Sequence, residues 1–488
     1  MITTNKLKPW QVPKANQLAR ILQAHDSAID GSDTGTGKTY LAVAIAQALQ
    51  LPTVAVVPKI AISGWKVVCE HFGETLSIIN YERLRLGHTP FGSWSNQAAL
   101  DAGRPTIYVC EFCQRKYSSP EDLQQQLCPV NASGIHCVST RTKDVPYGDF
   151  KFHSAVRFII FDEVHKCGGL DSLNSELLVA AKRQGIKHLM LSATPAQTIL
   201  QLRALGYSLD LHCLDIRGLV ESNTKGAKRK VFSGWLAEHG ATFDKTFHAW
   251  KWWVSDEKQK QTMLEIGSQI FPARGIRVTT DQIPNFPEVD VQAQLIDFTT
   301  TEEIAEIYRS IEHEINITQI LHARQAIEIL KVPTLVELAR DRMEQNFNVG
   351  IFCNFRQSIE ELSGALHCPF IDGTITGKKR DEIIASFQRN ECRALVLNSE
   401  VGGVNIGLQD IEGKHPRWGL VCPPWSAATF TQVLGRFPRD GGKSKSHYRV
   451  PFAAGTVEID MFRALRRKLD NHSAIMDSDL MPGNLKLK

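Results

Sequence analysis

The sequence lacks any long apolar run. No window of its 488 residues approaches the ~18 uninterrupted apolar residues that a transmembrane helix requires. Residues 1–10 also lack the apolar core of a secretory signal peptide. We therefore expect the protein to remain where it is made, in the cytoplasm of a bacterial or host cell, with the nucleus left open.

A strong charge of either sign is also missing. The chain has 56 Lys and Arg against 52 Asp and Glu, a net charge of +4, so any surface that binds a polyanion must be local. Eleven cysteines in a chain that is not secreted indicate reduced thiols or metal ligands rather than disulfides.

The length predicts two or three domains, because single hydrophobic cores stop growing well below this size.

The stretch SDTGTGKT at positions 32–39 has the pattern of a phosphate-binding loop. Its two glycines allow successive N–H groups to point at one anion, its lysine can reach the β- and γ-phosphates of ATP, and its last threonine can bind Mg²⁺. The strict pattern has Gly where this chain has Ser32, so a glycine-rich turn with a chance lysine is the alternative. We expect the nucleotide-binding residues of the loop to be Thr34, Gly35, Thr36, Gly37, Lys38 and Thr39.

A pair of acids follows an apolar run later in the chain. Residues 156–161 predict a buried strand, and Asp162 and Glu163 come directly after it. In this arrangement the first acid holds Mg²⁺, while the second orients and deprotonates the attacking water. Asp162 and Glu163 are therefore expected to be catalytic together with Lys38.

A third motif, Ser192-Ala193-Thr194, follows an apolar strand at 188–191. The phosphate loop, the D-E-V-H box at 162–165 and the S-A-T triplet, in this order, resemble the motifs of superfamily-2 helicases and translocases. The resemblance implies two RecA-like domains and the cofactors ATP and Mg²⁺. It also implies that His165 links the ATP site to the S-A-T triplet.

Two further residues of the first half gain a role from this resemblance. Lys59, after the strand at 53–58, corresponds to a residue that touches a nucleic-acid phosphate in the family. Gln11 lies in the segment Leu7-Lys8-Pro9-Trp10-Gln11, and its amide can both donate to and accept from the adenine edge. A surface glutamine at the start of a helix is the alternative for Gln11.

The second half of the chain continues the resemblance. Residues 291–345 carry apolar positions at helical spacing, which predict a long amphipathic helix. Asn354 corresponds to a position that contacts nucleic acid in the family. Gly402 and Gly403 belong to a glycine-rich stretch that resembles the nucleic-acid-binding motif of the Swi/Snf-like branch. Apolar runs predict further strands at 349–355 and 394–399, and the stretch Phe370-Ile371-Asp372-Gly373 resembles the next family element.

The segment from Gln432 to Arg439 matches the family pattern Q-x-x-G-R-x-x-R. We expect Arg436 and Arg439 to project from one helix face, one turn apart. They could then cross to the γ-phosphate as arginine fingers, with Gln432 beside the nucleotide. A salt-bridged helix face is the alternative.

Two segments fall outside the resemblance, residues 104–150 and 196–290. The first has a C-x-x-C pair and further Cys and His, which predict a Zn²⁺ site; a reduced Cys-rich insertion is the alternative. The expected ligands are Cys110, Cys113, Cys128 and Cys137, with His136 as an alternative fourth ligand. The second segment places Trp beside basic residues, which either stack on bases or pack a small helical subdomain.

These features predict an α/β fold of two tandem RecA-like domains with parallel sheets. The expected domains are residues 1–210 with the Cys-rich insertion, an inter-lobe segment at 211–290, and residues 291–488. The expected function is an ATP-dependent DNA helicase or translocase that binds DNA as a monomer, without a membrane. The alternatives are an RNA helicase of the D-E-x-H type and a nucleic-acid-binding scaffold with an inactive motor.

Overall fold

The computed structural model divides the chain into two compact units, one comprising residues 1–80 and 157–488 and the other residues 81–156. The residues that it describes are 2, 5–96, 106–110, 116–117, 138–142, 148–216, 219–220, 230–296, 298, 300–311, 317–375, 377–400, 406–453 and 458–475. No helix in these ranges combines the length and the apolar character needed to cross a bilayer.

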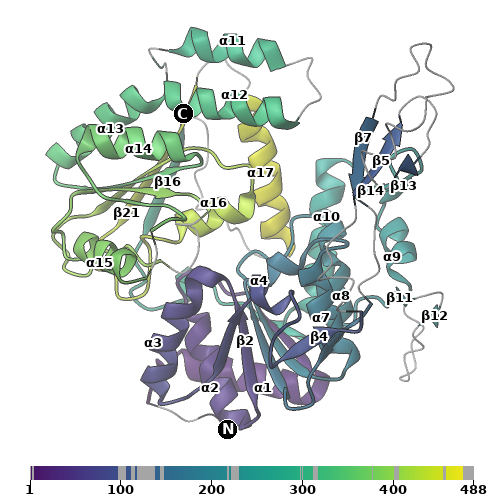
Figure 1. Cartoon of the computed structure of the whole chain (residues 1–488). Helices are drawn as coiled ribbons and strands as arrows, with labels where there is room; N and C mark the ends of the chain where they lie inside the picture. Colours follow the sequence, from purple (N-terminus) through teal and green to yellow (C-terminus); the bar gives the residue numbers. More distant parts are fainter. Residues whose placement is uncertain are drawn as a thin grey trace, which may run out of the picture. The chain divides into compact units, whose positions relative to one another are not determined.

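A six-stranded parallel sheet forms the first lobe of the larger unit, in the order β15-β1-β10-β9-β2-β3. In Figure 1 this lobe is the part that contains β2 and the helices α1, α2 and α3. The central strands of the sheet are buried along almost their whole length because helices cover both faces of such a sheet. The strands are β1 (Ser27–Asp30), β2 (Thr53–Val57), β3 (Ser77–Asn80), β9 (Phe158–Asp162), β10 (Lys187–Leu191) and β15 (Gly275–Ile276).

Helices α1, α2 and α3 of the first lobe share one hydrophobic core with alternate residues of these strands. The helices of this lobe are α1 (Gln11–His25), α2 (Lys38–Leu49), α3 (Ile62–Phe72), α7 (Leu173–Arg183) and α8 (Arg203–Ser208), with the short 3₁₀ turns η1 (Lys59–Ala61), η2 (Val164–Cys167) and η3 (Ile199–Leu202). Parallel strands end at a common edge, so the loops after β1, β9 and β10 meet there.

A second six-stranded parallel sheet forms the second lobe, in the order β16-β21-β20-β17-β19-β18. Its strands are β16 (Val289–Ile296), β17 (Asn348–Cys353), β18 (Phe370–Ile371), β19 (Ala394–Asn398), β20 (Arg417–Val421) and β21 (Ser446–Ala453). Its helices are α11 (Thr301–Ile311), α12 (Ile317–Leu330), α13 (Val332–Glu344), α14 (Arg356–Leu366), α15 (Gly377–Gln388), α16 (Ala427–Leu434) and α17 (Glu458–Ile475).

The long helix predicted for residues 291–345 is wrong. Residues 289–296 form strand β16, whose alternating apolar residues pair with β21. The helical part is divided into α11, α12 and α13, and Pro333 lies in the first turn of α13. Proline has no N–H and fits only the start of a helix, so it begins a new helix instead of extending α12.

The segment between the lobes is not only helical. It contains the paired strands β11 and β12, the hairpin β13–β14 and two helices, and it ends with β15 in the first sheet. Its elements are β11 (Asp215–Ile216), β12 (Leu219–Val220), α9 (Phe232–Glu238), β13 (Thr242–Asp244), β14 (Ala249–Lys251), α10 (Asp256–Ile270) and η4 (Thr280–Gln282). The first lobe therefore takes its edge strand from this segment.

The smaller unit consists of short antiparallel strands. Strands β4 and β8 pair with each other, and β6, β5 and β7 form a three-stranded sheet in that order. Its elements are α4 (Tyr81–Leu84), β4 (Gly92–Trp94), β5 (Thr106–Cys110), β6 (Lys116–Tyr117), β7 (Val138–Thr142) and β8 (Phe150–Phe152). The predicted α/β class with two parallel sheets is confirmed for the chain.

Candidate functional site

The phosphate loop connects β1 to α2 at the carboxyl edge of the first sheet. Gly35 and Gly37 have φ angles of 81° and 82°, a conformation that residues with a side chain rarely adopt. Lys38 begins α2, and its Nζ donates hydrogen bonds to the carbonyls of Ser32 at 2.8 Å and Asp33 at 2.9 Å. The loop thus gathers an ammonium group and a helix N-terminus at one point, where an anion is stabilised.

The segment that follows β15, residues 277–280, contacts the phosphate loop and fixes its position. Arg277 forms an ion pair with Asp33 at 2.7 Å, and the Thr280 N–H donates to the same carboxylate at 3.0 Å. The hydroxyl of Ser32 accepts a hydrogen bond from the Val278 N–H at 3.1 Å. Ser32, which replaces the glycine of the strict pattern, therefore anchors the loop. Sequence analysis missed these contacts because the partners lie far apart in the chain.

Gln11 is buried beneath the phosphate loop. Its Nε2 donates to the Thr36 carbonyl at 3.3 Å, and its Oε1 accepts from the Lys8 N–H at 3.0 Å. A Cβ atom on Gly37 would lie only 2.6 Å from Gln11 Nε2, so glycine is required there for this contact as well as for its φ angle. The structure thus places Gln11 against the loop backbone, and its contact with adenine stays a prediction.

Asp162 ends β9 and is almost fully buried. Its Oδ2 accepts a hydrogen bond from the indole Nε1 of Trp65 at 2.8 Å, and the Trp65 side chain is fully buried in α3. Burial, followed by the charge of Glu163, raises the pKa of Asp162 to about 7. A bound divalent cation favours the ionised form, so this carboxyl suits a metal ligand that one indole holds in orientation.

Glu163 lies in the left-handed conformation with φ of 54°. Its Oε2 is 3.3 Å from Nδ1 of His165, and the same nitrogen is 3.2 Å from Oγ of Ser192. Burial alone would raise the pKa of Glu163, but the hydrogen bond and charge of His165, with Lys38 and Arg436, outweigh it and lower that pKa. The structure therefore brings an ionised candidate base, His165 and the S-A-T triplet into one chain of contacts.

Arg436 and Arg439 do not share a helix face. Helix α16 ends at Leu434, with Gly435 as its C-cap, so both arginines lie in the turn that follows. Pro438 in this turn cannot donate the hydrogen bond that would continue the helix. The turn lies directly against the phosphate loop, because a Cβ atom on Gly435 would be 2.0 Å from Thr34 Oγ1.

Burial changes the acidity of both guanidinium groups. It lowers the pKa of Arg439 to about 10, and burial together with the charge of Arg439 lowers the pKa of Arg436. Arg436 donates to the Ile406 carbonyl at 3.1 Å. Among the described residues, its Nε and the Nε2 of Gln432 are buried donors without an acceptor. Such donors favour a ligand that supplies oxygen atoms.

One cavity of about 730 Å³ joins these groups. It contains the phosphate loop and acids of the first lobe together with the arginines of the second. A triphosphate fits this set of donors, with Thr39 and Asp162 able to hold Mg²⁺. Its lining includes Lys8, Gln11, Thr34, Gly35, Gly37, Lys38, Thr39, Tyr40, His71, Asp162, Glu163, Gln432, Arg436 and Arg439.

The predicted nucleic-acid contacts are only partly described. Lys59 is exposed at the start of η1, as a phosphate contact requires. Asn354 follows β17, and its Nδ2 donates inward to Glu328 Oε2 at 2.7 Å. Gly402 and Gly403 lie outside the described residues.

The predicted zinc ligands are also incompletely described. Cys113, Cys128, His136 and Cys137 fall outside the described ranges, and of Cys110 only its place at the end of β5 is given. The pairing of β5 with β7 sets Cys110 opposite Val138, the residue after Cys137. Cys110 and the residue that follows Cys137 in the sequence therefore lie opposite each other in paired strands.

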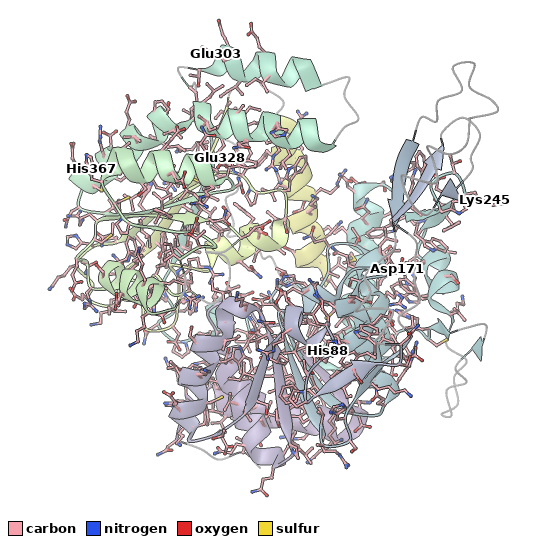
Figure 2. All side chains as sticks on the ribbon, viewed as in Figure 1. His88, Asp171, Lys245, Glu303, Glu328 and His367 are labelled. Atoms are coloured by element: carbon pink, nitrogen blue, oxygen red, sulfur yellow. The ribbon has the colours of Figure 1, made fainter. Side chains whose placement is uncertain are left out.

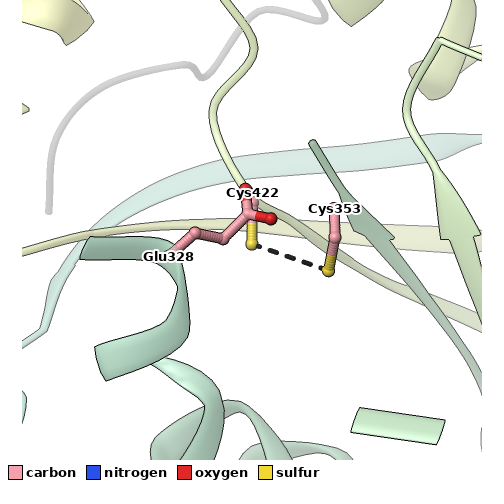
Figure 3. Close-up of side chains that lie close together, drawn as sticks. All are labelled: Glu328, Cys353 and Cys422. Atoms are coloured by element: carbon pink, nitrogen blue, oxygen red, sulfur yellow. Dashed lines mark hydrogen bonds between the residues drawn. The ribbon is translucent and has the colours of Figure 1, made fainter. Parts of the chain in front are cut away.

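Glu328 of α12, labelled in Figure 2, lies beside the thiols of Cys353 and Cys422, and the three ligand atoms are within 4.8 Å of one another (Figure 3). The carboxylate already accepts hydrogen bonds from the N–H groups of Asn354 and Phe355. The hydrogen bond with Cys422, together with burial, raises the pKa of Cys353. The contacts that the structure shows for this carboxylate position Asn354 and Phe355 at the end of β17.

Comparison with known proteins agrees with this geometry. Residues 330–441, which include both arginines, match the helicase conserved C-terminal domain. Over 98% of its length the chain is 28% identical to L364 of Acanthamoeba polyphaga mimivirus, named as an ATP-dependent RNA helicase, and it covers 85% of that protein.

Two further relatives match shorter stretches. YwqA of Bacillus subtilis, named as an ATP-dependent helicase/translocase, is 25% identical over 31% of the chain. The DNA repair and recombination protein RDH54 of Saccharomyces cerevisiae is 27% identical over 30% of the chain. The matches cover 16% of each of these proteins. Among solved structures, Dbp5 of S. cerevisiae bound to RNA and ADP BeF3 aligns over 99% of this chain and 93% of its own, with 10% identity and a TM-score of 0.46.

Replacing Trp65 with phenylalanine keeps the packing of α3 but removes the donor to Asp162. Loss of a hydrogen bond to a charged group corresponds to about 1.5–3 kcal/mol. We expect the Mg²⁺ concentration for half-maximal ATPase activity to rise by about ten-fold, with little change in the melting temperature. Trp94→Phe is the matched control, since the Trp94 indole donates to a backbone carbonyl at 2.8 Å in the smaller unit. An unchanged Mg²⁺ dependence in Trp65→Phe would remove Trp65 from the site.

Proposed function

We propose that the chain is a superfamily-2 helicase, a nucleic-acid-dependent ATPase that acts as a DNA translocase or helicase driven by ATP; the match to the helicase conserved C-terminal domain and the helicase relatives support this. The observation that carries the proposal is the composite cavity, in which Lys38, Asp162 and Glu163 of the first lobe meet Arg436 and Arg439 of the second. Neither lobe holds the complete set of charged groups, so hydrolysis is coupled to the approach of the lobes.

The residues divide the work of hydrolysis among them. The phosphate loop and Lys38 bind the triphosphate, while Thr39 and Asp162 hold Mg²⁺, which neutralises phosphate charge. Glu163 accepts the proton of the attacking water, and its lowered pKa keeps it ionised for this step. Arg436 and Arg439 stabilise the charge that develops on the phosphate oxygens in the transition state.

A route from the nucleotide to the nucleic acid starts at the same base. Glu163 contacts His165, which contacts Ser192 of the S-A-T triplet. Helix α3 provides a second route, because it holds Asp162 through Trp65 and accepts a hydrogen bond from Arg380 of α15 at Ser63, at 2.9 Å. Through both routes, the state of the nucleotide changes how tightly the two lobes bind a nucleic-acid strand.

DNA is the proposed polymer on the strength of the Swi/Snf-like pattern of motifs in the second half of the chain. The stretch shared with RDH54, which is named as a DNA repair and recombination protein, supports it. The second candidate is an RNA helicase, which the name of the relative matched along nearly the whole chain favours. Translocation along either polymer uses the same ATP site, so only the choice of nucleic acid separates the two.

Lys38→Ala and Glu163→Gln should each abolish ATPase activity while leaving the fold intact. Lys38→Ala also removes the group that reaches the phosphates, so it should weaken binding of a fluorescent ATP analogue, whereas Glu163→Gln should retain that binding. Glu176→Gln, which alters a carboxylate paired with Arg203, is the matched control and should hydrolyse ATP normally. Turnover at the wild-type rate in either site variant would reject the assignment.

The choice of polymer is tested by the ATPase rate with a panel of nucleic acids. We expect stimulation by blunt duplex, forked or single-stranded DNA to exceed stimulation by RNA, with Lys38→Ala as the control for contaminating activity. Stimulation by RNA alone would establish the second candidate. A rate that no nucleic acid changes would contradict both.

We also propose that the insertion at 104–150 binds one zinc ion through Cys110, Cys113, Cys128 and either Cys137 or His136. The register of β5 and β7 supports it, since it places Cys110 opposite Val138. Purified protein should contain stoichiometric zinc by mass spectrometry, and a Cys110→Ser, Cys113→Ser double variant should lose it. Cys392→Ser, outside the insertion, should retain it. Absence of zinc from the wild-type protein would contradict the proposal.

A further inference from the structure

The hairpin β13–β14 displays the two most exposed large aromatic side chains among the described residues. The Trp253 side chain is 78% exposed and Phe247 is 71% exposed. Trp252, by contrast, is buried, and its Nε1 donates to the His239 carbonyl at 2.9 Å. Successive residues of an extended segment point to opposite sides, so Trp252 anchors the hairpin while Trp253 faces solvent.

Lys251 lies between the two exposed rings. Its Nζ is 4.4 Å from the centroid of Phe247 and 4.3 Å from that of Trp253, both within the range of a cation–π contact. The same ammonium group forms an ion pair with Asp244 at 2.5 Å. We call these three side chains, Phe247, Lys251 and Trp253, the aromatic clamp. Each ring is fixed by Lys251 on one side and open to solvent elsewhere.

Asp244 also fixes the turn that carries Phe247. Its Oδ1 accepts hydrogen bonds from the N–H groups of Thr246 at 2.9 Å and Phe247 at 3.1 Å. On the opposite face of the hairpin, Phe243 packs edge-on against Trp250, with ring centroids 5.5 Å apart. Asp244, through the turn and its ion pair with the ammonium group of the clamp, therefore holds the clamp in shape before any ligand binds, which reduces the entropy lost on binding. In this described part of the hairpin, no ring-stacking or cation–π contact joins the Phe243–Trp250 pair to the three clamp side chains.

We propose that the aromatic clamp is a binding site for unpaired bases of the nucleic acid on which the motor acts, and this inference rests on the proposed function. Flat, exposed rings stack on bases without regard to sequence, because every base has a π-face. Lys245 in the exposed turn, labelled in Figure 2, supplies a cation for the phosphate backbone. Paired bases inside a duplex have no free face, so the clamp selects single strands.

The position of the hairpin in the chain supports a polymer as its ligand. Helix α10 begins three residues after Trp253 and packs against α17 of the second lobe, where Asn471 donates to Gln259 at 2.9 Å. The same segment continues into β15 and to Arg277, which holds Asp33 of the phosphate loop. A force on the clamp thus reaches the ATP site through one continuous stretch of chain.

The test compares variants of the full-length protein in binding to labelled single-stranded oligonucleotides without ATP, measured by fluorescence anisotropy. Phe247→Ala and Trp253→Ala should each raise the Kd for oligothymidylate and oligouridylate by about ten-fold. Phe243→Ala, which removes a ring from the opposite face, is the matched control and should bind as the wild type does. The basal ATPase rate without nucleic acid should be unchanged in all three, since none contacts the ATP site.

A second readout is photocrosslinking to an oligonucleotide that carries 5-iodouridine, which should label Trp253 in the wild-type protein. Unchanged Kd values for both clamp variants, or equal losses in Phe243→Ala, would overturn the proposal and leave the clamp as a contact for another protein. If the wild-type protein binds no nucleic acid and none stimulates its ATPase, the proposed function fails as well. Normal stimulation with unaltered binding in the clamp variants refutes only the clamp.

Discussion

Lys38, Arg436 and Arg439 are among the cations that line one cavity, and the arrangement of both lobes depends on how their charge is balanced. Burial disfavours the charged forms of Arg436 and Arg439, as the lowered pKa values of these two arginines show. Glu163 is the anion that acts on both arginines. A triphosphate with its metal supplies the remaining negative charge. The charges that line the cavity are therefore balanced only when nucleotide is bound.

The phosphate loop is fixed from two directions. Arg277 and the backbone of residues 278–280 hold Ser32 and Asp33 on one side. The turn that contains Gly435 packs against Thr34 on the other. Both contacts come from segments outside the strand and helix that carry the loop. The position of the phosphate loop therefore depends on both the inter-lobe segment and the second lobe. Coupling between ATP binding and movement of the lobes requires such a dependence.

Local patterns in the sequence were sufficient for some of these features and not for others. The strands before Asp162 and at 349–353 follow from continuous apolar runs, and the phosphate loop follows from its glycines and Lys38. The hydrogen bond from Trp65 to Asp162 has no local signal, although a buried indole N–H always needs an acceptor. The Q-x-x-G-R-x-x-R pattern predicts helix through Arg439, whereas Gly435 caps α16 and Pro438 prevents its continuation. The sequence predicts helix rather than strand at 291–296 because the helical spacing of the apolar residues that follow is stronger than the period-2 alternation of β16.

The hydrogen bonds that the segment after β15 makes with Ser32 and Asp33 have a consequence for the order in which the protein folds. Their partners Val278 and Thr280 lie 246 and 247 residues further along the chain, and strand β15, which completes the first sheet, directly precedes them. During translation the emerging N-terminal lobe therefore lacks both an edge strand and the support of its phosphate loop. The ribosome must release most of the inter-lobe segment before a stable nucleotide pocket can form, so a fragment that ends at residue 210 would be a poor substitute for the lobe.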